Sequence, residues 1–210
     1  MIRIAVADYG AGNLVSICRA LEVVGAEPTI VRDPEALLRA DGLIVPGVGA
    51  PGPAMERLRR RGLIEPIQAW IRAGRPFLGI CLGLQLLFDG SDEDGAATLG
   101  VLTGRTVELR GAPTLPHIGW NTVDRSGEHP LFDGIAPAAA FYFVHSYVAE
   151  PADPDLVIAE SEHGPRFPAA IAREDLLAVQ FHPERSGPDG LRLLANFAGI
   201  VAGSPAALVA

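Results

Sequence analysis

The sequence predicts an α/β protein in three layers, with a mostly parallel central sheet that is covered by helices on both faces. Short apolar runs typical of buried strands alternate with helical patterns through about the first 90 residues. In the second half, strand-like runs are separated by turn residues rather than by helices, which indicates antiparallel additions. A chain of 210 residues can bury one core of this kind, so we expect a single domain over residues 1–210.

The first half carries the repeating strand and helix pattern. Residues 2–8 are expected to form a strand and residues 14–24 a helix, with Asn13 as its N-cap. One apolar stripe of that helix consists of Leu14, Ile17, Cys18 and Leu21. The pattern continues with a strand at 28–31, a helix opened by Asp33-Pro34, a strand at 43–45, a loop rich in Pro and Gly at 46–52, helical stretches to about residue 73, and a buried strand at 76–80.

The second half is predicted to contain short strands near 105–110, 117–124, 141–148, 156–160, 168–172 and 176–181. A last helix from about Pro188 to Val201 is expected to close the domain. The Gly-Ser-Pro-Ala tail that follows is expected to be frayed.

The charged residues exclude several classes of function. The formal net charge is −8, and the chain has no lysine, so its 17 cationic side chains are all arginine. Schiff-base catalysis and a P-loop are therefore excluded. No basic patch suggests a nucleic-acid partner, and no apolar run approaches the ~20 residues needed to span a membrane. The first residues lack the pattern of a signal peptide, so we expect a cytoplasmic location.

The segment Gly79-Ile80-Cys81-Leu82-Gly83 has the form of a nucleophile elbow with cysteine in the place of serine. It follows the strand at 76–80 and precedes the apolar segment Leu84–Phe88, which is expected to be helical. Flanking glycines permit the tight turn, and a helix that starts after Cys81 favours the thiolate and directs backbone N–H groups at an oxyanion. The alternative, a buried core cysteine, is disfavoured by this glycine context.

His182 is the best candidate for the base that a thiol nucleophile needs. It ends the apolar run at 176–181, and Pro183 favours an extended backbone at His182. An extended chain places His182 and Glu184 on the same side, so that Glu184 can orient the imidazole. The alternative is a surface His-Pro-Glu turn without a catalytic role.

The other histidines, His117, His129, His145 and His163, are expected to be structural. None of them is spaced from another His, Cys or carboxylate in a metal-site pattern. We therefore predict no metal ion and no cofactor. Cys18 lies on the apolar stripe of the first predicted helix and is expected to be a small core residue.

Two glycine-rich loops follow predicted strands. The loop Pro46–Gly52 lies where open α/β folds place their sites, and its permissive backbone can present an amide to an oxyanion. The loop Gly10–Asn13 partly matches a dinucleotide fingerprint, with Asp33 at a suitable distance for a ribose contact. Val15 stands at the third glycine position, and Asp33 before Pro34 fits a helix N-cap better, so nucleotide binding is a weak alternative.

Taken together, these motifs resemble those of the class I, or triad-type, glutamine amidotransferases, which have a three-layer, flavodoxin-like fold. Pro46–Gly49, Gly79–Gln85 and Gln180–Ser186 match motifs shared across that class. Three further segments resemble more closely the glutaminase subunit of imidazole glycerol-phosphate synthase: Asp8–Leu14, Pro116–Asn121 and Tyr142–Tyr147. The likeness extends from about Asp8 to Gly187.

The resemblance implies that Cys81 attacks the side-chain amide of L-glutamine, that His182 protonates the departing ammonia, and that Glu184 completes the triad. Water activated by His182 would then hydrolyse the glutamyl thioester. The resemblance also implies two sets of binding residues: the amides of Val48 and Leu82 as oxyanion donors, and Gly49, Gln85, Ser146 and Tyr147 as the glutamine pocket.

The implied partner is a (β/α)₈ cyclase subunit, joined in a heterodimer. It would use the ammonia to make imidazole glycerol phosphate and an aminoimidazole carboxamide ribotide in histidine biosynthesis. The residues implied to face the cyclase are Gly10, Asn13, Asn121, Tyr142 and Arg185. The chain departs from the family pattern at Arg185, where lysine is common, and at Pro51, where phenylalanine is frequent.

Two other functions stay open at the level of sequence. The glutaminase component of anthranilate or aminodeoxychorismate synthase would lack the segments Pro116–Asn121 and Tyr142–Tyr147 in combination. A non-catalytic partner subunit would not need Cys81, His182 and Glu184 together. Both alternatives are therefore disfavoured.

Overall fold

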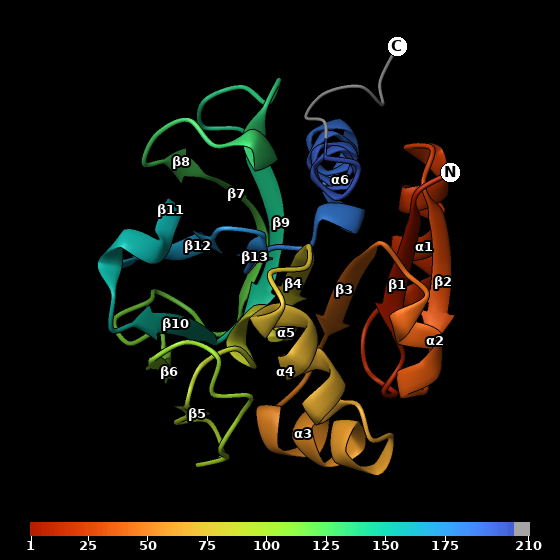
Figure 1. Ribbon diagram of the computed structural model, residues 1–210. Helices are drawn as coiled ribbons and strands as arrows, with labels where there is room; N and C mark the ends of the chain where they lie inside the picture. The colour runs from red at the N-terminus through yellow and green to blue at the C-terminus, as the bar shows by residue number, and fades with distance from the viewer. Residues whose placement is uncertain (204–210) are drawn as a thin grey trace.

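The computed structural model describes residues 1–203, and an eight-stranded sheet runs through the centre of this part of the chain (Figure 1). Its strands, in spatial order, are β2 (Glu27–Val31), β1 (Arg3–Ala7), β3 (Gly42–Gly47), β4 (Phe77–Cys81), β13 (Leu176–Val179), β12 (Arg166–Arg173), β11 (Val157–Glu162) and β8 (Asp124–Arg125). The strands from β2 to β13 pair in parallel, and β12, β11 and β8 continue the sheet antiparallel. The predicted α/β class is confirmed.

Helices cover both faces of the sheet, because the parallel strands are apolar on both sides. In β1, for example, Ile4 and Val6 belong to one buried cluster, whereas Ala5 and Ala7 belong to the other. The first cluster includes α1 (Leu14–Val23) and α6 (Gly187–Val201), and the second includes α2 (Pro34–Leu38), α3 (Pro51–Arg60) and α4 (Ile64–Arg72). This arrangement gives the three predicted layers.

Two small sheets are added in the second half of the chain. One joins β10 (Tyr147–Pro151), β6 (Gly104–Glu108) and β5 (Gly90–Ser91), and the other joins β7 (His117–Thr122) and β9 (Ala140–His145). The pairs β6/β10 and β7/β9 are antiparallel, as the turn-rich sequence predicted. Figure 1 shows the sheet of β5, β6 and β10 far from the end of the molecule that carries α1 and β2. The short elements are α5 (Leu82–Gln85) and the 3₁₀ turns at Pro130–Phe132, Pro154–Leu156 and Pro183–Arg185.

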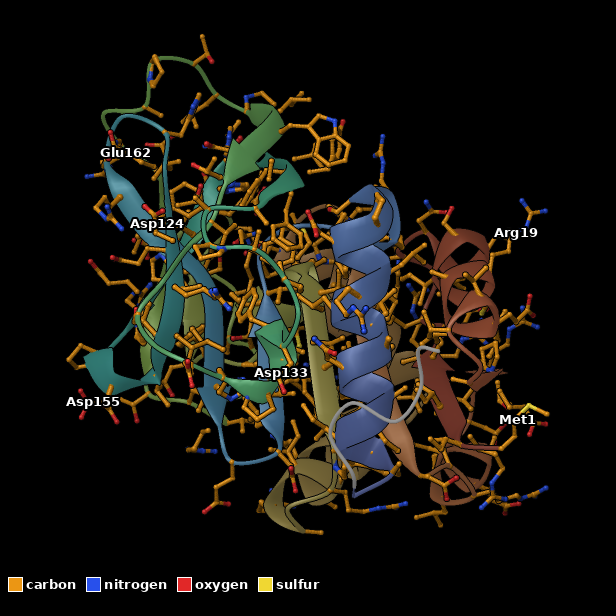
Figure 2. All side chains as sticks on the ribbon, turned by 90° about the horizontal axis from the view of Figure 1, so that it is seen from above. Met1, Arg19, Asp124, Asp133, Asp155 and Glu162 are labelled. Carbon is orange, nitrogen blue, oxygen red and sulfur yellow. The ribbon has the colours of Figure 1, made fainter. Side chains whose placement is uncertain are left out.

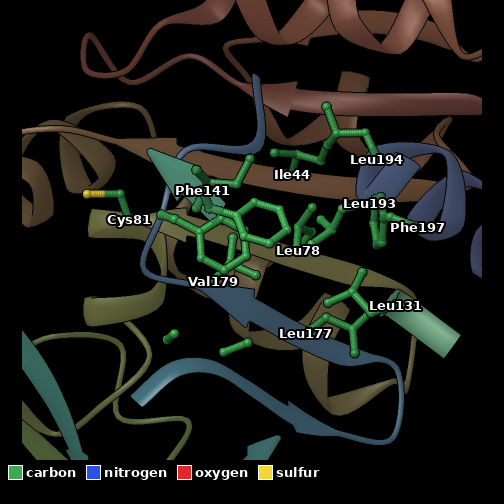
Figure 3. Close-up of a cluster of buried hydrophobic side chains, with 14 of the residues drawn as sticks. Ile44, Leu78, Cys81, Leu131, Phe141, Leu177, Val179, Leu193, Leu194 and Phe197 are labelled. Atoms are coloured by element: carbon green, nitrogen blue, oxygen red, sulfur yellow. The ribbon is translucent and has the colours of Figure 1, made fainter. Parts of the chain in front are cut away.

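One hydrophobic cluster connects the central strands to α6 (Figure 3). Leu78 of β4 and Val179 of β13 belong to the same cluster as Leu193 and Phe197 of the helix, and all four side chains are buried. Burial of each such side chain contributes about 1.5–3 kcal/mol. The strands that end at the candidate site are therefore held firmly by the core.

Charged side chains lie on the outside of the fold. Arg19, Asp124, Asp155 and Glu162 are exposed, and Arg19, Asp155 and Glu162 stand at the periphery in Figure 2. Within residues 1–203, no helix combines the length and the apolar composition needed to cross a membrane.

Most predicted elements are found with their ends shifted by a few residues, but the apolar segment after Cys81 was predicted wrongly. The helix α5 stops at Gln85, and residues 86–88 form turns. The reason lies in a contact with a segment further along the chain. The carbonyl groups of residues 86–88 accept hydrogen bonds from the backbone N–H groups of residues 99–102 instead of continuing a helix.

Three further expectations need correction. The strand predicted at 141–148 is two strands, because the chain leaves β9 for another sheet at Ser146. The loop predicted at 46–52 is shorter, since β3 extends to Gly47 and α3 begins at Pro51. Asn13 stands at the N-cap of α1, but its side chain makes no capping hydrogen bond.

The cap predicted at Asp33 is confirmed, because its carboxylate accepts a hydrogen bond from the backbone N–H of Ala36 at 2.9 Å. The expected fraying of the tail concerns mostly residues 204–210, which lie outside the described part of the chain.

Candidate active site

Three parallel strands bring the predicted catalytic residues to one edge of the sheet. Cys81 ends β4, and the segment His182–Glu184 follows β13, the parallel neighbour of β4. Val48–Gly49 follows β3 on the other side, where Gly47 pairs with Cys81. Because these strands run in the same direction, residues distant in sequence meet beyond their carboxyl ends.

Cys81 has the backbone of a nucleophile elbow. Its φ of 54° and ψ of −108° are rare for a residue other than glycine, so the surrounding structure has to hold this conformation. A Cβ atom at Gly83 would collide with the carbonyl oxygen of Val45, and one at Gly79 would lie 2.7 Å from the carbonyl oxygen of Gly83. The flanking glycines are thus a steric requirement of the turn.

The sulfur of Cys81 points out of the core. Figure 3 places Cys81 at one end of the hydrophobic cluster, with its sulfur directed away from the other side chains. The Sγ atom lies 3.9 Å from the carbonyl oxygen of Val144 and 3.6 Å from the amide nitrogen of Gln180. The next residue, Leu82, is the first of α5.

His182 and Glu184 form a buried pair. Nδ1 of His182 lies 2.9 Å from Oε1 of Glu184, and the two side chains are only 4% and 1% exposed. The backbone at His182 is extended as predicted, with φ of −105° and ψ of 94°, but the chain does not stay extended. A 3₁₀ turn over Pro183–Arg185 follows and brings the two side chains together, so their predicted proximity is right. Ser186 fixes the turn, since its hydroxyl donates to the carbonyl of His182 and accepts from the backbone N–H of Tyr142.

The surroundings of His182 favour its protonated form. Burial alone lowers the pKa of His182, but Cys81 and Glu184 together outweigh burial and raise it to about 10. The Nε2 atom is buried and has no hydrogen-bond partner among residues 1–203. That nitrogen is therefore free to exchange a proton with a group bound beside Cys81.

A pocket of about 200 Å³ opens next to Cys81. This volume lies below the roughly 300–1,000 Å³ of pockets for drug-sized ligands, so the pocket suits a small substrate. All residues predicted for the oxyanion hole and the glutamine pocket line it: Val48, Gly49, Leu82, Gln85, Ser146 and Tyr147. Glu93 and His145, which the sequence analysis did not assign to the site, also contribute to its wall.

Two further residues at the site were missed from the sequence. Gln180 is completely buried beside Cys81. Its sequence signals are that it interrupts an apolar run and begins the segment Gln180–Ser186, but no role was assigned to it. Tyr9 is buried beneath the loop that carries Val48, where its hydroxyl donates to the carbonyl of Pro46 at 2.6 Å. A Cβ atom at Gly47 would collide with that hydroxyl, so the two segments are closely fitted.

The residues predicted to face a partner lie near the same edge of the sheet. Arg185 is exposed, with its guanidinium carbon 4.2 Å from the ring centre of Tyr142. Trp120, which is 58% exposed, contacts the same tyrosine edge-on. Gly10 and Asn13 are exposed in the loop after β1. The family departure at Arg185 is thus accommodated by a cation–π contact.

Asn121, the remaining residue predicted to face the partner, makes its side-chain hydrogen bonds within the chain. Its amide nitrogen lies 2.7 Å from the carbonyl oxygen of Glu162 and 3.3 Å from Nε2 of His117. Nδ1 of His117 is 3.0 Å from Nε2 of His145, whose Nδ1 is 3.0 Å from the carbonyl oxygen of Tyr147. Because that carbonyl can only accept, the hydrogens are directed along the chain from Asn121 towards Tyr147.

This chain of hydrogen bonds requires neutral imidazoles. Burial lowers the pKa of His145 to about 3 and that of His117 to about 4. The neighbouring His163 lowers the pKa of His117 further, and His117 lowers that of His145. Their unfolded-state pKa is about 6.5, so between pH 6.5 and these lower values the unfolded chain binds more protons than the folded chain. Stability is therefore lost as the pH falls through this window.

We predict that replacing His117 and His145 together by glutamine flattens the acid dependence of stability. Each histidine contributes up to about 1.4 kcal/mol per pH unit, so the slope between pH 6.5 and 5 should decrease by up to about 2.8 kcal/mol per unit. Urea denaturation at several pH values measures this slope. Since the comparison concerns slopes, a uniform loss of stability in the variant does not affect it, and an unchanged slope would contradict the assignment.

Another surface hollow among residues 1–203 lacks the side chains of a nucleophilic site. A larger surface hollow of about 590 Å³ lies between β6, β10 and β12, but no cysteine, serine or histidine lines it. Within residues 1–203, no group of three or more His, Cys, Asp or Glu side chains is arranged to hold a metal ion.

Two comparisons of the sequence with known proteins agree with each other. The family model for glutamine amidotransferase class-I matches residues 5–200. The imidazole glycerol phosphate synthase subunit HisH of Synechococcus elongatus is 50% identical, over 99% of this chain and 98% of that protein. The HisH subunit of Symbiobacterium thermophilum is 46% identical, over 96% of this chain and 95% of that protein.

Solved structures with low sequence identity share the fold. The structure described as PurLQS from Thermotoga maritima superposes with a TM-score of 0.74 at 20% identity, over 95% of this chain and 98% of that one. The glutaminase domain of Trypanosoma brucei CTPS, with bound acivicin, gives a TM-score of 0.74 at 16% identity, over 100% of this chain and 97% of that one. At these identities the likeness concerns the fold alone.

Proposed function

Since this chain belongs to the class I glutamine amidotransferases, we propose that Cys81, His182 and Glu184 are the triad that hydrolyses the side-chain amide of L-glutamine. The observation that carries the proposal is the buried pair of His182 and Glu184 beside a cysteine in a strained elbow. A thiol with an oriented base at hand is the arrangement that nucleophilic catalysis requires. Full-length likeness to HisH subunits makes the chain the glutaminase subunit of an imidazole glycerol phosphate synthase.

In the first half-reaction the sulfur of Cys81 attacks the amide carbon of glutamine and forms a C–S bond. The proton on Nε2 of His182 passes to the amide nitrogen, the C–N bond breaks, and ammonia leaves. The raised pKa of His182 suits this role, because the imidazole begins the step protonated. A glutamyl thioester on Cys81 and a neutral His182 remain.

In the second half-reaction His182 acts as a base. Its free Nε2 takes a proton from water, the resulting hydroxide attacks the thioester carbon, and the C–S bond breaks to release glutamate and the thiolate of Cys81. Glu184 holds Nδ1 throughout and stabilises the imidazolium each time it forms.

The developing oxyanion in both steps needs backbone donors. We assign this role to the amide of Leu82, which directly follows Cys81, and to the amide of Val48, which follows β3. Both residues line the pocket beside Cys81, and this position supports the assignment.

The remaining pocket residues have suitable chemistry for the amino-acid end of glutamine. Glu93 supplies a carboxylate in the wall, which would pair with the α-ammonium group. Gly49, Gln85, Ser146 and Tyr147 contribute polar backbone or side-chain groups to the same wall. A substrate with one charged end and one amide end is consistent with this lining.

A glutaminase subunit of this synthase works with a cyclase subunit. We propose that the cyclase is a (β/α)₈ barrel, that the two chains form a heterodimer, and that residues 1–210 act as one domain within it. The exposed side chains of Trp120 and Arg185, the half-buried Tyr142 that both contact, and the loop of Gly10–Asn13 form the proposed docking face. Asn121 would support this face from within, because its amide is bonded inside the chain.

The proposal is tested by measuring glutamate release from L-glutamine with the purified chain, alone and with a cyclase subunit and its ribonucleotide ligand. The chain alone should be nearly idle, because hydrolysis without an acceptor wastes glutamine. The complete mixture should be faster by roughly 5–150-fold or more, the usual range of coupling between sites. Equal rates in both mixtures would contradict the coupling, and no release in any mixture would contradict the proposed triad.

A further inference from the structure

Gln180 directly follows β13, the parallel neighbour of the strand β4 that carries Cys81. The register of β4 and β13 pairs Ile80 with Val179, so Gln180, the first residue after β13, lies level with Cys81, the last residue of β4. The Gln180 side chain is completely buried, although burial of an amide without hydrogen bonds is costly. Its two polar atoms therefore need partners, and both partners belong to the site.

The orientation of this amide is fixed by its neighbours. The carbonyl oxygen of Tyr147 can only accept, so the group of Gln85 that lies 2.9 Å from it is the amide nitrogen. The same nitrogen of Gln85 lies 3.2 Å from Gln180, which must therefore present its oxygen there. The amide nitrogen of Gln180 is consequently the atom that faces the sulfur of Cys81, at 3.6 Å.

We propose that Gln180 is a further residue of the catalytic centre, whose amide N–H donates to the sulfur of Cys81 and stabilises its thiolate form. This inference rests on Cys81 being the nucleophile proposed above. The oxygen of Gln180 also has a role, because it accepts a hydrogen bond from Gln85 in the wall of the pocket. This bond holds the Gln180 amide in the orientation that faces the sulfur.

The environment of the sulfur explains why such a donor is needed. The carbonyl oxygen of Val144 lies 3.9 Å from the Sγ atom of Cys81, where it can accept a hydrogen bond from the thiol but repels the thiolate. The amide N–H of Gln180 offsets that repulsion. Because an amide does not ionise, it remains a donor at any ordinary pH. A hydrogen bond to an ionised group is also stronger than one between neutral groups.

Methionine is apolar and about as long as glutamine, so Gln180→Met removes the amide while largely keeping the packing. Alkylation of Cys81 in the isolated chain by iodoacetamide at neutral pH, followed by mass spectrometry, reports thiolate reactivity without a partner or glutamine. We expect alkylation at least about tenfold slower than in the wild type, the size expected for losing a hydrogen bond to a charged group. Alkylation of Cys18 in the same samples should not change.

Gln68→Met is the matched control. The amide of Gln68 donates to the carbonyl oxygen of Leu99 at 2.7 Å, and it contacts neither Cys81 nor the pocket lining. This variant loses a half-buried amide by the same substitution, so Cys81 should be alkylated in it at the wild-type rate. Wild-type alkylation of Cys81 in Gln180→Met would overturn the proposal.

Gln180→Glu separates a direct contact from a packing role. A protonated carboxyl can donate to the sulfur, whereas an ionised carboxylate repels the thiolate. The alkylation rate of Cys81 in this variant, divided by the wild-type rate at the same pH, should therefore fall as the pH rises. A ratio independent of pH would mean that Gln180 acts only through packing.

Glutamate release in the complete mixture gives the catalytic readout. Gln180→Met should lower kcat by about tenfold or more, since the attacking sulfur is affected. A rise in KM alone, with kcat unchanged, would assign Gln180 to pocket shape and overturn the proposal. If the wild type releases no glutamate, the proposed function fails while the alkylation experiments still decide the role of Gln180.

Discussion

Replacing Cys81 by alanine is expected to lower glutamine-dependent glutamate release by at least about 10³-fold, because no thioester can form without the sulfur. The reaction of the partner cyclase with supplied ammonium should continue, since it does not need the thiol. Glutamate release and cyclase product, measured with glutamine or with ammonium as the nitrogen source, check both expectations.

The Cys81→Ala variant should fold normally. Its side chain lies at the end of the hydrophobic cluster, and alanine loses only the sulfur, which points away from that cluster (Figure 3). Thermal unfolding followed by circular dichroism checks this. Cys18→Ala is the matched control, because Cys18 is a half-buried cysteine on α1 outside the pocket and its loss should leave glutamate release unchanged. Glutamine-dependent turnover in Cys81→Ala would show that the chain is a docking subunit or uses another nucleophile.

Replacing Glu184 by glutamine is expected to lower kcat by about 10²–10⁴-fold, by analogy with the loss of the carboxylate from other triads. The carboxylate holds Nδ1 of His182 at 2.9 Å and contributes to the raised pKa of that imidazole. Without it the pKa of His182 falls, and the imidazolium that protonates the leaving ammonia is lost at lower pH. The alkaline decline of kcat/KM should therefore move to lower pH in the variant.

The pH dependence of kcat/KM for wild type and Glu184→Gln between pH 6 and 10 measures both effects. Glu160→Gln is the control, because Glu160 forms an ion pair with Arg166 at 3.2 Å, is half-exposed and does not line the pocket. It removes the same charge by the same substitution and should keep the wild-type profile. Wild-type kcat in Glu184→Gln would exclude Glu184 as the orienting residue.

The local parts of the site could be predicted from the sequence. The glycines around Cys81 identified a tight turn, and the structure gives their reason as a lack of space for a Cβ atom at Gly79 and Gly83. His182 and Glu184 were also identified from their separation of two residues. The extended backbone at His182 was predicted correctly, but the 3₁₀ turn over Pro183–Arg185 was not, because a single short segment does not reveal whether it turns or extends.

The parts of the site built from distant segments could not be predicted. The bridge from Gln85 to Gln180, and the chain of imidazoles from His117 to His145, join residues that lie far apart in sequence. The histidines were expected to be structural, and the structure adds that His145 also lines the substrate pocket. Nothing in one sequence states which strands are neighbours, so such contacts have no local signal.

The sequence by itself determined the α/β class and the tight turn at Cys81, because apolar periodicity and glycine spacing act over a few residues of chain. The residues that line the pocket beside Cys81 followed only from the resemblance to glutamine amidotransferases. The tertiary structure alone decided that α5 ends at Gln85, where carbonyl groups pair with residues 99–102. It also decided that Gln180 faces the sulfur, because the pairing of β13 with β4 sets which side chains meet. Buried polar groups take the partners that the fold brings to them, and strand order fixes those partners.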